Sequence, residues 1–566
     1  MTTRGRKDVG RPARTRPSLL GTAAGVGGAG DEVRPATREE TFPVAMGALV
    51  LGIFSLLMCL RRDYLLLYGD AVAHLGIARR IVDSRNPGLV QLGGVWLPLP
   101  HLLMVPFVQN MEWWRNGLAG AWPSLVFYIL GVAGIYRLAR RMMVPRWAFA
   151  AAAFYALNPN LLYLSTTAMT EPLFLAIVIW MVLLTMECGA AIRAAETALV
   201  QRRLIFIALL IVAAVFTRYD GWVLGAAVWC VLTWQLWQRR EVWREVSTAF
   251  VVFTLLAVAG PVSWFAYNQH FFHDWLDFMR GPYSAAAIDK RTTPPGAGHY
   301  RGWHNPAWAL VLYTRTSQVD AAAWELGFGV MAAAIAGLVL AVRRRIALSA
   351  LLLWLPLPFY VYSVAYGSVP IFIPQLWPHS YYNSRYGMEM LPALAVFGFL
   401  AVAWGEQWLR GRQPLAGRLL RPVVLLLIVL NTIAMMYRVP LVLKEAQVNS
   451  VTRVAFEKAL AQIIEGLPPG SPILMYNSNF VGALQDAGIP LRQTVNEEDR
   501  DSWQAALKAP AQHAAFVIAI AGDAVSKAVE EHPEGLTEMT ILCTTGQPCA
   551  RVYQSTEFGS APGAHP

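Results

Sequence analysis

The stretch STTAMTEPLFLAIVIWMVLLTM, residues 165–186, places a single carboxylate, that of Glu171, at the start of a long apolar run. A helix that crosses a membrane needs roughly 20 mostly apolar residues, and this run is typical of one. About eleven such stretches lie between Phe42 and Arg438. The sequence therefore predicts an α-helical, polytopic membrane protein.

Composition and charge agree with this fold class. Of the 566 residues, 56% are hydrophobic and 15% are charged, so the chain is too apolar for an ordinary soluble enzyme. The net charge of +11 does not indicate nucleic acid, because the basic residues gather in alternate loops, while residues 441–566 carry 8 Lys and Arg against 14 Asp and Glu. A basic cytoplasmic face explains this distribution, and we expect no nucleic-acid partner.

The predicted topology follows from the arginine-rich loops. Residues 1–41 are rich in Arg, Gly and Thr, lack the apolar core of a cleavable signal peptide, and are expected to form a disordered cytoplasmic tail. With the N-terminus inside, every predicted cytoplasmic loop carries three or more arginines, as the positive-inside rule requires. The predicted spans are about 43–60, 117–138, 147–164, 171–186, 204–217, 222–237, 248–267, 323–342, 346–366, 388–409 and 422–437.

An odd number of spans places the C-terminal part of the chain outside the inner (plasma) membrane. We therefore expect a transmembrane domain over residues 42–438 and a soluble extracytoplasmic domain over residues 439–566. Three long loops are expected to share the outer face with that domain, at 61–116, 268–322 and 367–387.

The C-terminal domain is predicted to be a small α/β domain, because strand-like and helix-like runs alternate along it. The strand-like runs are 472–476, 515–520 and 539–543, and the helix-like runs are 451–466, 481–487, 502–509 and 524–532. No glycine-rich phosphate loop follows any of these strands, so no nucleotide is assigned. Cys543 and Cys549 bracket a short turn, and a disulfide is expected there if the domain is extracytoplasmic; two unpaired thiols are the alternative.

Ionisable residues at the points where spans meet the outer face are the candidates for chemistry, because a charge near hydrocarbon is costly. Asp70 and His74 follow the first span four residues apart, so they share a helix face. Asp70 could equally cap that helix. Glu171 precedes Pro172 at the start of the fourth span, where Thr170 could be the helix cap and the helix dipole favours a glutamate.

Two further places meet the same criterion. Arg218 and Asp220 lie in a turn between two spans and could simply neutralise each other, which is the stronger alternative there. Arg385 and Tyr386 precede the tenth span, where an arginine could anchor the membrane surface or bind a lipid phosphate. His304 is a weaker candidate, since loop histidines are more often surface residues than ligands.

At these residues the chain resembles the GT-C superfamily of multi-span glycosyltransferases, such as the protein O-mannosyltransferases (glycosyltransferase family 39) and the aminoarabinose transferase of lipid A. The resemblance rests on Asp70 after the first span, on Glu171 before Pro-Leu-Phe, and on Arg385-Tyr386 ahead of Leu-Pro. The mannosyltransferases generally have an Asp-Glu pair in the first loop, whereas Ala71 follows Asp70 here, so protein mannosylation is not implied.

The resemblance implies transfer of a sugar, a hexose or a pentose, from a polyprenyl-phosphate donor to a glycan, lipid or protein hydroxyl at the outer face. Asp70 would act as the base, Glu171 would orient the acceptor or help to hold a divalent cation, and Arg385 would bind the donor phosphate. A divalent cation is possible, but we do not expect an essential metal.

The alternative is a multi-span transporter or lipid flippase, which also has many spans and a few buried charges. A transporter should place charged residues near the middle of its spans and often has internal repeats. The sequence has neither feature, and its ionisable residues gather on one predicted face, which favours the enzyme.

Overall fold

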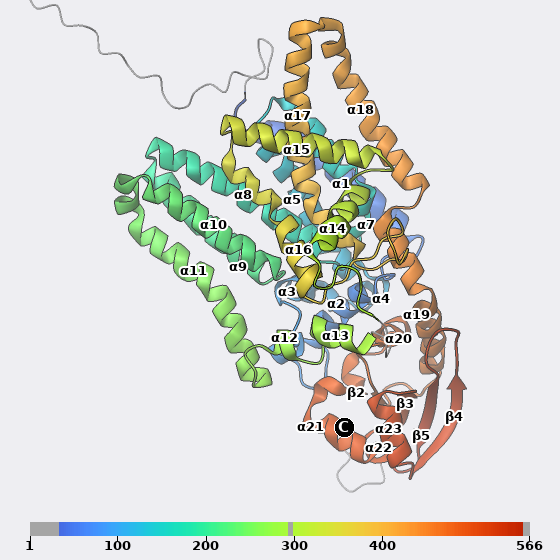
Figure 1. The fold of residues 1–566 in the computed structure, drawn as a ribbon. Coiled ribbons are helices and arrows are strands. Elements are labelled where there is room, and N and C mark those ends of the chain that lie inside the picture. The colour runs from blue at the N-terminus through green and yellow to red at the C-terminus, as the bar shows by residue number, and fades with distance from the viewer. Residues whose placement is uncertain (1–32, 293–297, 559–566) are drawn as a thin grey trace, which may run out of the picture.

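The structure is a computed structural model that describes residues 33–292 and 298–558 (Figure 1). Within these ranges it contains nine helical spans that are long and apolar enough to cross a membrane, which confirms the polytopic helical class. The nine are α1 (Arg38–Leu60), α5 (Leu118–Arg140), α8 (Glu171–Ala194), α9 (Thr197–Val215), α11 (Arg240–Phe272), α15 (Leu326–Arg344), η2 with α16 (Leu348–Tyr366), η3 with α17 (Ser384–Arg412), and α18 with α19 (Pro414–Glu465).

Two of the eleven predicted spans form helices that do not reach this length or hydropathy. The predicted span 147–164 is divided into α6 (Pro145–Ala156) and α7 (Pro159–Leu164), because the Asn158 side chain accepts hydrogen bonds from two backbone N–H groups and starts a new helix. The predicted span 222–237 is α10 (Asp220–Trp237), which begins with a carboxylate.

The first helix begins earlier than predicted. The Thr37 side chain accepts from the Glu40 backbone N–H, and the Glu40 side chain accepts from that of Thr37, which together form a capping box. Residues 38–41 are therefore helical rather than disordered, and residues 1–32 of the predicted tail lie outside the described residues.

The most enclosed spans are α8 and the η3–α17 span, each with 83% of its apolar window buried. Glu171 is the first residue of α8, and Arg385 lies in η3 (Ser384–Met390), directly before α17 (Leu391–Arg412). Two of the candidate residues are therefore held where the two most enclosed spans begin.

A five-stranded sheet forms the C-terminal part of the chain, in the order β2-β1-β3-β5-β4. β1 is parallel to β2 and β3, whereas β5 is antiparallel to β3 and β4. The strands are β1 (Ile473–Met475), β2 (Thr494–Val495), β3 (Phe516–Ile520), β4 (Leu536–Leu542) and β5 (Ala550–Ser555), and the helices at the predicted places are α20 (Val481–Ala487), α21 (Asp501–Lys508) and α23 (Ala524–Glu531). The three predicted strands are present, but β2 and β5 were not predicted.

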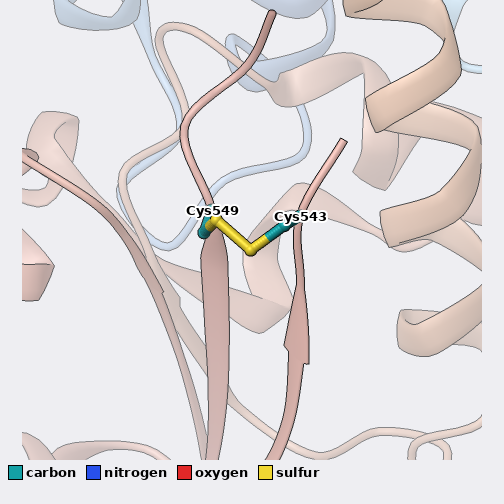
Figure 2. Close-up of a disulfide and its surroundings, with 2 residues drawn as sticks. All are labelled: Cys543 and Cys549. Atoms are coloured by element: carbon teal, nitrogen blue, oxygen red, sulfur yellow. A yellow bond between two sulfur atoms is a disulfide. The ribbon is translucent and has the colours of Figure 1, made fainter. Parts of the chain in front are cut away.

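The disulfide between Cys543 and Cys549 is present (Figure 2). Cys543 directly follows β4 and Cys549 directly precedes β5, so the bond closes the turn between two antiparallel strands. The expected pairing is therefore confirmed, and the alternative of two unpaired thiols is wrong.

The C-terminal domain contacts the loops that were predicted to share its face. Figure 1 shows the sheet at one end of the bundle, opposite the turn between α17 and α18. The contacts include a hydrogen bond from Arg115 to the Asp486 carbonyl, an ion pair of Arg80 with Glu498, a hydrogen bond between the Tyr283 and Tyr476 hydroxyls, and a hydrogen bond from Asn449 to the Tyr381 carbonyl. Different ion pairs join helices elsewhere in the bundle, including those of Glu406 on α17 with Arg146 on α6 and with Arg421 on α18 (Pro414–Tyr437).

Candidate active site

Five of the candidate residues come together in the structure, and each of them lies at or near the start of a helix. Asp70 is in the first turn of α2 (Gly69–Arg80), and Glu171 is the first residue of α8. Arg218 precedes α10, whose first residue is Asp220. With Arg385 in η3, five residues from four distant parts of the chain meet at one end of these helices.

Arg385 forms hydrogen bonds with both Asp70 and Glu171. Its Nη2 donates to Asp70 Oδ2 at 2.6 Å, and its Nε donates to Glu171 Oε1 at 3.0 Å. The Asp70 side chain is 41% exposed, whereas that of Glu171 is 0% exposed and that of Arg385 is 9% exposed. Asp70 is thus the carboxylate of this group that a substrate can reach.

Arg218 binds the same carboxylate oxygen of Glu171 as Arg385 does. Its Nη1 donates to Glu171 Oε1 at 3.3 Å, its Nε pairs with Asp220 at 3.4 Å, and its Nη2 lies 3.0 Å from Glu389 Oε1. Burial alone would lower the pKa of this guanidinium, but the surrounding acidic groups, including these carboxylates, outweigh it and raise the pKa. Arg218 therefore remains charged, and the predicted local pair with Asp220 is one part of a larger network.

Two tyrosines complete the network. The centroid of the Tyr386 ring lies 5.1 Å from each of the two guanidinium groups. The Tyr360 hydroxyl accepts from Arg218 Nη2 at 2.7 Å and lies 2.6 Å from Glu389 Oε1 and 3.3 Å from Asp220 Oδ2. Tyr386, a sequence candidate, is therefore in the site as a cation–π partner.

The cluster contains more carboxylates than guanidinium groups. Among the described residues, the ion-pair partners of Asp70, Glu171, Asp220 and Glu389 are Arg218 and Arg385. Within the part of the chain that the structure describes, Oε2 of Glu171 and Oε2 of Glu389 are buried without a hydrogen-bond partner. A buried acceptor without a donor is costly, so the site is suited to bind a group that donates hydrogen bonds or carries positive charge.

His74 lies near Asp70 but has a different partner. Its Nδ1 is 2.8 Å from His101 Nε2, so one ring donates and the other accepts, and its ring is tilted against Trp96 at 4.3 Å. Burial lowers the pKa of His74 to about 4, although the charge of Asp70 opposes the shift. His74 is therefore neutral at pH 7 and serves the packing of α2 on α3 (Leu99–Val108).

This pair predicts a pH dependence of stability. Because the folded pKa of His74 is below the unfolded value of about 6.5, its contribution is fully present above that pH and is lost as the pH falls toward about 4. We expect the unfolding temperature in detergent to decrease less steeply below pH 6.5 in His74→Gln, which does not titrate, than in the wild type. If the unfolding temperatures of the wild type and His74→Gln changed in parallel with pH, this expectation would be wrong. The control is His270→Gln, because His270 is exposed.

His304 is not part of the cluster. Its backbone N–H donates to the Ala365 carbonyl, and its ring contacts Trp303 and Tyr366. None of these residues belongs to the network around Arg218 and Arg385, so this weaker candidate has a local packing role.

The capping role considered for Asp70 is wrong. The N-cap of α2 is Tyr68, and no side chain forms a cap hydrogen bond there, so Asp70 does not cap its helix. Thr170 is the N-cap residue of α8, as expected, but its side chain forms no cap hydrogen bond; its hydroxyl accepts from Arg218 Nη1 at 3.1 Å instead. Both residues therefore belong to the cluster.

Glu389, Tyr360 and Tyr68 were not predicted as site residues. Glu389 lies between two methionines, and Tyr360 lies inside an apolar run, so neither has a local polar pattern. Tyr68 packs its ring 5.3 Å from the Arg385 guanidinium. The only sequence signal for Glu389 is that it is a carboxylate within a membrane-spanning segment, which is by itself a sign of function.

The described residues include no group of three or more His, Cys, Asp or Glu side chains placed to hold a metal ion. A small cavity of about 20 Å³ lies beside Asp220 and Glu389 and is otherwise lined by apolar residues of α8, α10 and the segment formed by η2 (Leu348–Trp354) and α16 (Pro356–Tyr366). A space of this size holds about one water molecule, which could donate to Glu389.

A comparison with protein-family models finds no match for the sequence, and a comparison with curated proteins finds none. Among solved structures, the chain is similar to ArnT from Cupriavidus metallidurans bound to undecaprenyl phosphate, with a TM-score of 0.55 and 15% identity over 91% of this chain and 98% of that one. The apo state of the same protein gives a TM-score of 0.52 and 14% identity over 90% and 98%. ArnT is an aminoarabinose transferase with the GT-C fold, so the predicted GT-C fold is confirmed.

Proposed function

We propose that this chain, which has the GT-C fold of ArnT, is a membrane glycosyltransferase that moves a sugar from a polyprenyl-phosphate donor to an acceptor hydroxyl. The observation that carries the proposal is the contact of half-exposed Asp70 with buried Arg385 at 2.6 Å. Such a pair would supply a base for the acceptor directly beside a cation for the departing phosphate, which supports the proposal.

Asp70 is the proposed general base. Its Oδ2 accepts from Arg385, while its Oδ1 has no hydrogen bond from the described residues and can accept the proton of an acceptor hydroxyl. As that proton moves to Asp70, the acceptor oxygen forms a bond to the anomeric carbon of the sugar. The bond from this carbon to the phosphate oxygen breaks, and its electron pair stays on the phosphate.

Arg385 is the proposed phosphate ligand. Its Nε and Nη2 bind carboxylates, but no described residue accepts a hydrogen bond from its Nη1. That N–H group can donate to a phosphate oxygen while the other two keep the guanidinium in place. The negative charge that develops on the leaving group is then stabilised at the moment when the sugar is transferred.

For Glu171 we propose a different role from the one expected for it. Because its side chain is 0% exposed and its Oε1 accepts from both Arg218 and Arg385, it is poorly placed to orient an acceptor. We assign it as a positioning residue that holds the two guanidinium groups together. Among the described residues, Oε2 of Glu171 has no hydrogen-bond donor, so this oxygen can accept a hydrogen bond when a substrate is bound while Oε1 keeps both guanidinium groups in place.

The acceptor class, a glycan, lipid or protein hydroxyl, and the outer face of the inner membrane remain part of the proposal. The support is the arginine-rich loops of the predicted cytoplasmic face and the contacts of the C-terminal domain with the loop that carries Asp70. In particular, Arg453 of that domain's first helix donates to the Leu66 and Leu67 carbonyls. The domain is therefore near enough to help receive an acceptor.

A transporter or flippase is less well supported. The charged residues of the cluster lie at or near the starts of α2, α8, α10 and α17, rather than halfway along the spans. Sites of secondary transporters typically lie near the middle of the bilayer. The position of the cluster thus favours chemistry at a membrane surface.

Removal of divalent cations is expected to leave the transfer rate unchanged. Arg218 and Arg385 already supply positive charge beside Asp70 and Glu171, so the leaving phosphate has a cationic partner without a metal. The measurement is the initial transfer rate with and without EDTA. A rate that falls with EDTA and recovers with Mg²⁺ or Mn²⁺ would show that a cation binds these carboxylates.

The experiment that tests the proposed function is a donor screen. The purified chain is reconstituted in vesicles with membrane acceptors and polyprenyl phosphates that carry radiolabelled hexoses or pentoses. We expect the label to leave at least one donor and polyprenyl phosphate to accumulate. If every donor remains intact, although the unfolding temperature shows that the protein is folded, the proposal fails.

A further inference from the structure

One face of α19 (Leu441–Glu465) contacts the two segments that carry Asp70 and Arg385. The residues of this face are Val442, Glu445, Asn449 and Arg453. They follow one another at intervals of three or four, so they lie on one side of the helix. The same helix continues to Glu465 and leads directly to β1 of the C-terminal sheet.

Glu445 binds the segment immediately before Arg385. Its Oε1 accepts from the backbone N–H of Asn383 at 3.0 Å, and its Oε2 accepts from that of Ser384 at 2.8 Å and from the Ser384 hydroxyl. Glu445 is 2% exposed. The first N–H groups of a helix lack partners within it, and a carboxylate there is stabilised by the helix dipole, so Glu445 caps η3 from another helix.

The same face of α19 also holds the segment before Asp70. The Tyr68 hydroxyl donates to the Val442 carbonyl at 3.1 Å, and Arg453 Nη2 donates to the Leu66 and Leu67 carbonyls, each at 3.0 Å. Each partner of the Asp70–Arg385 ion pair therefore lies within four residues of a hydrogen bond to α19. The ion pair itself spans 315 residues of sequence.

We propose that Glu445 is a positioning residue for sugar transfer, which holds the Arg385 guanidinium on Asp70 and Glu171. Through α19 the C-terminal sheet is then mechanically joined to the reacting groups. This inference rests on the proposed function. A small displacement of a catalytic group can reduce its rate by on the order of 100-fold, so the effect should appear in kcat.

The first test is a comparison of Glu445→Gln with the wild type. The glutamine has nearly the same size, but its amide group can accept from only one of the two backbone N–H groups. We expect kcat to fall about tenfold or more, with a smaller change in the donor KM. Glu406→Gln is the matched control, because Glu406, near the C-terminal end of α17, is a carboxylate of similar exposure, 1%, that pairs with three arginines outside the cluster.

A double-mutant cycle separates positioning from a general structural role. If Glu445 acts through Arg385, then Glu445→Gln should lower kcat much less in the Arg385→Lys background than in the wild type. A purely structural role would lower the amount of folded protein by the same factor in both backgrounds. Equal losses of kcat per folded protein in the two backgrounds would overturn the proposal.

A structural readout does not depend on any assay of transfer. Cryo-electron microscopy of Glu445→Gln should show the Asn383–Arg385 segment displaced and the Arg385 guanidinium beyond hydrogen-bond distance of the Asp70 carboxylate. An unchanged Asp70–Arg385 ion pair would overturn the positioning role. If the wild type transfers no sugar, the proposed function fails, and this comparison still decides whether Glu445 positions Arg385.

Discussion

Replacement of Asp70 by asparagine should abolish measurable sugar transfer while the protein remains folded in the membrane. Asparagine keeps the shape of the side chain but cannot accept the proton of the acceptor hydroxyl, and loss of a general base typically costs about 10²- to 10⁴-fold in rate. Because 41% of the Asp70 side chain is exposed, the variant should unfold at nearly the temperature of the wild type. The measurement is kcat per folded protein.

Asp63→Asn is the control for this variant. Asp63 lies in the turn after α1, is exposed, and has a positive φ of 54° that asparagine tolerates well. It should leave transfer unchanged. Equal activity of Asp70→Asn and the wild type would leave the fold intact but would remove Asp70 from the mechanism.

Replacement of Arg385 by alanine should damage both activity and stability. When the Arg385 guanidinium is removed, Glu171 loses one of its two cationic partners and Asp70 loses its ion pair. Removal of one partner of a buried ion pair costs about 3–5 kcal/mol, which should appear as a lower unfolding temperature. The loss of phosphate stabilisation should lower kcat by about 10²- to 10³-fold.

Arg385→Lys distinguishes the two effects. Lysine keeps the charge but cannot reach both carboxylates and a phosphate, so we expect a nearly normal unfolding temperature with a strongly reduced kcat. Arg301→Lys, on an arginine that lies over Trp308 and Trp377 outside the cluster, is the control. If Arg385→Lys retained full activity, a precise phosphate contact would not be required.

The helical part of the fold was largely predictable, because long apolar runs indicate helices that cross the membrane and arginine clusters indicate the loops between them. The errors have local causes. Asn158-Pro159 is itself a signal for a helix start, which divides the predicted third span into α6 and α7. α19 begins at Leu441 rather than near 451, because residues 441–450 contain no breaking residue and continue the helix.

Strand β5 was not predicted, although the sequence contains a signal for it. A disulfide that closes the turn between Cys543 and Cys549 implies a strand on each side of it, and Ala550–Ser555 is that second strand. β2 contains only Thr494 and Val495, which is too short for any periodic pattern. The position of β5 between β3 and β4 depends on pairing with β3, which is distant in the sequence.

The candidate site was predictable only in part. Asp70, Glu171, Arg218, Asp220 and Arg385 could be named because each is ionisable and lies at the end of an apolar run. Their pairing could not be predicted, since Arg385 reaches partners 214 and 315 residues away. Glu445 was not considered, because it lies on a helix that was predicted to start after it.

The most direct test of the account is the stoichiometry of transfer. Radiolabelled sugar that reaches the acceptor is measured against polyprenyl phosphate released, in vesicles that contain the wild type or Asp70→Asn. We predict one sugar transferred for each polyprenyl phosphate released by the wild type, and neither product with the variant. Labelled donor that crosses the vesicle membrane intact, with no polyprenyl phosphate released, would contradict the account.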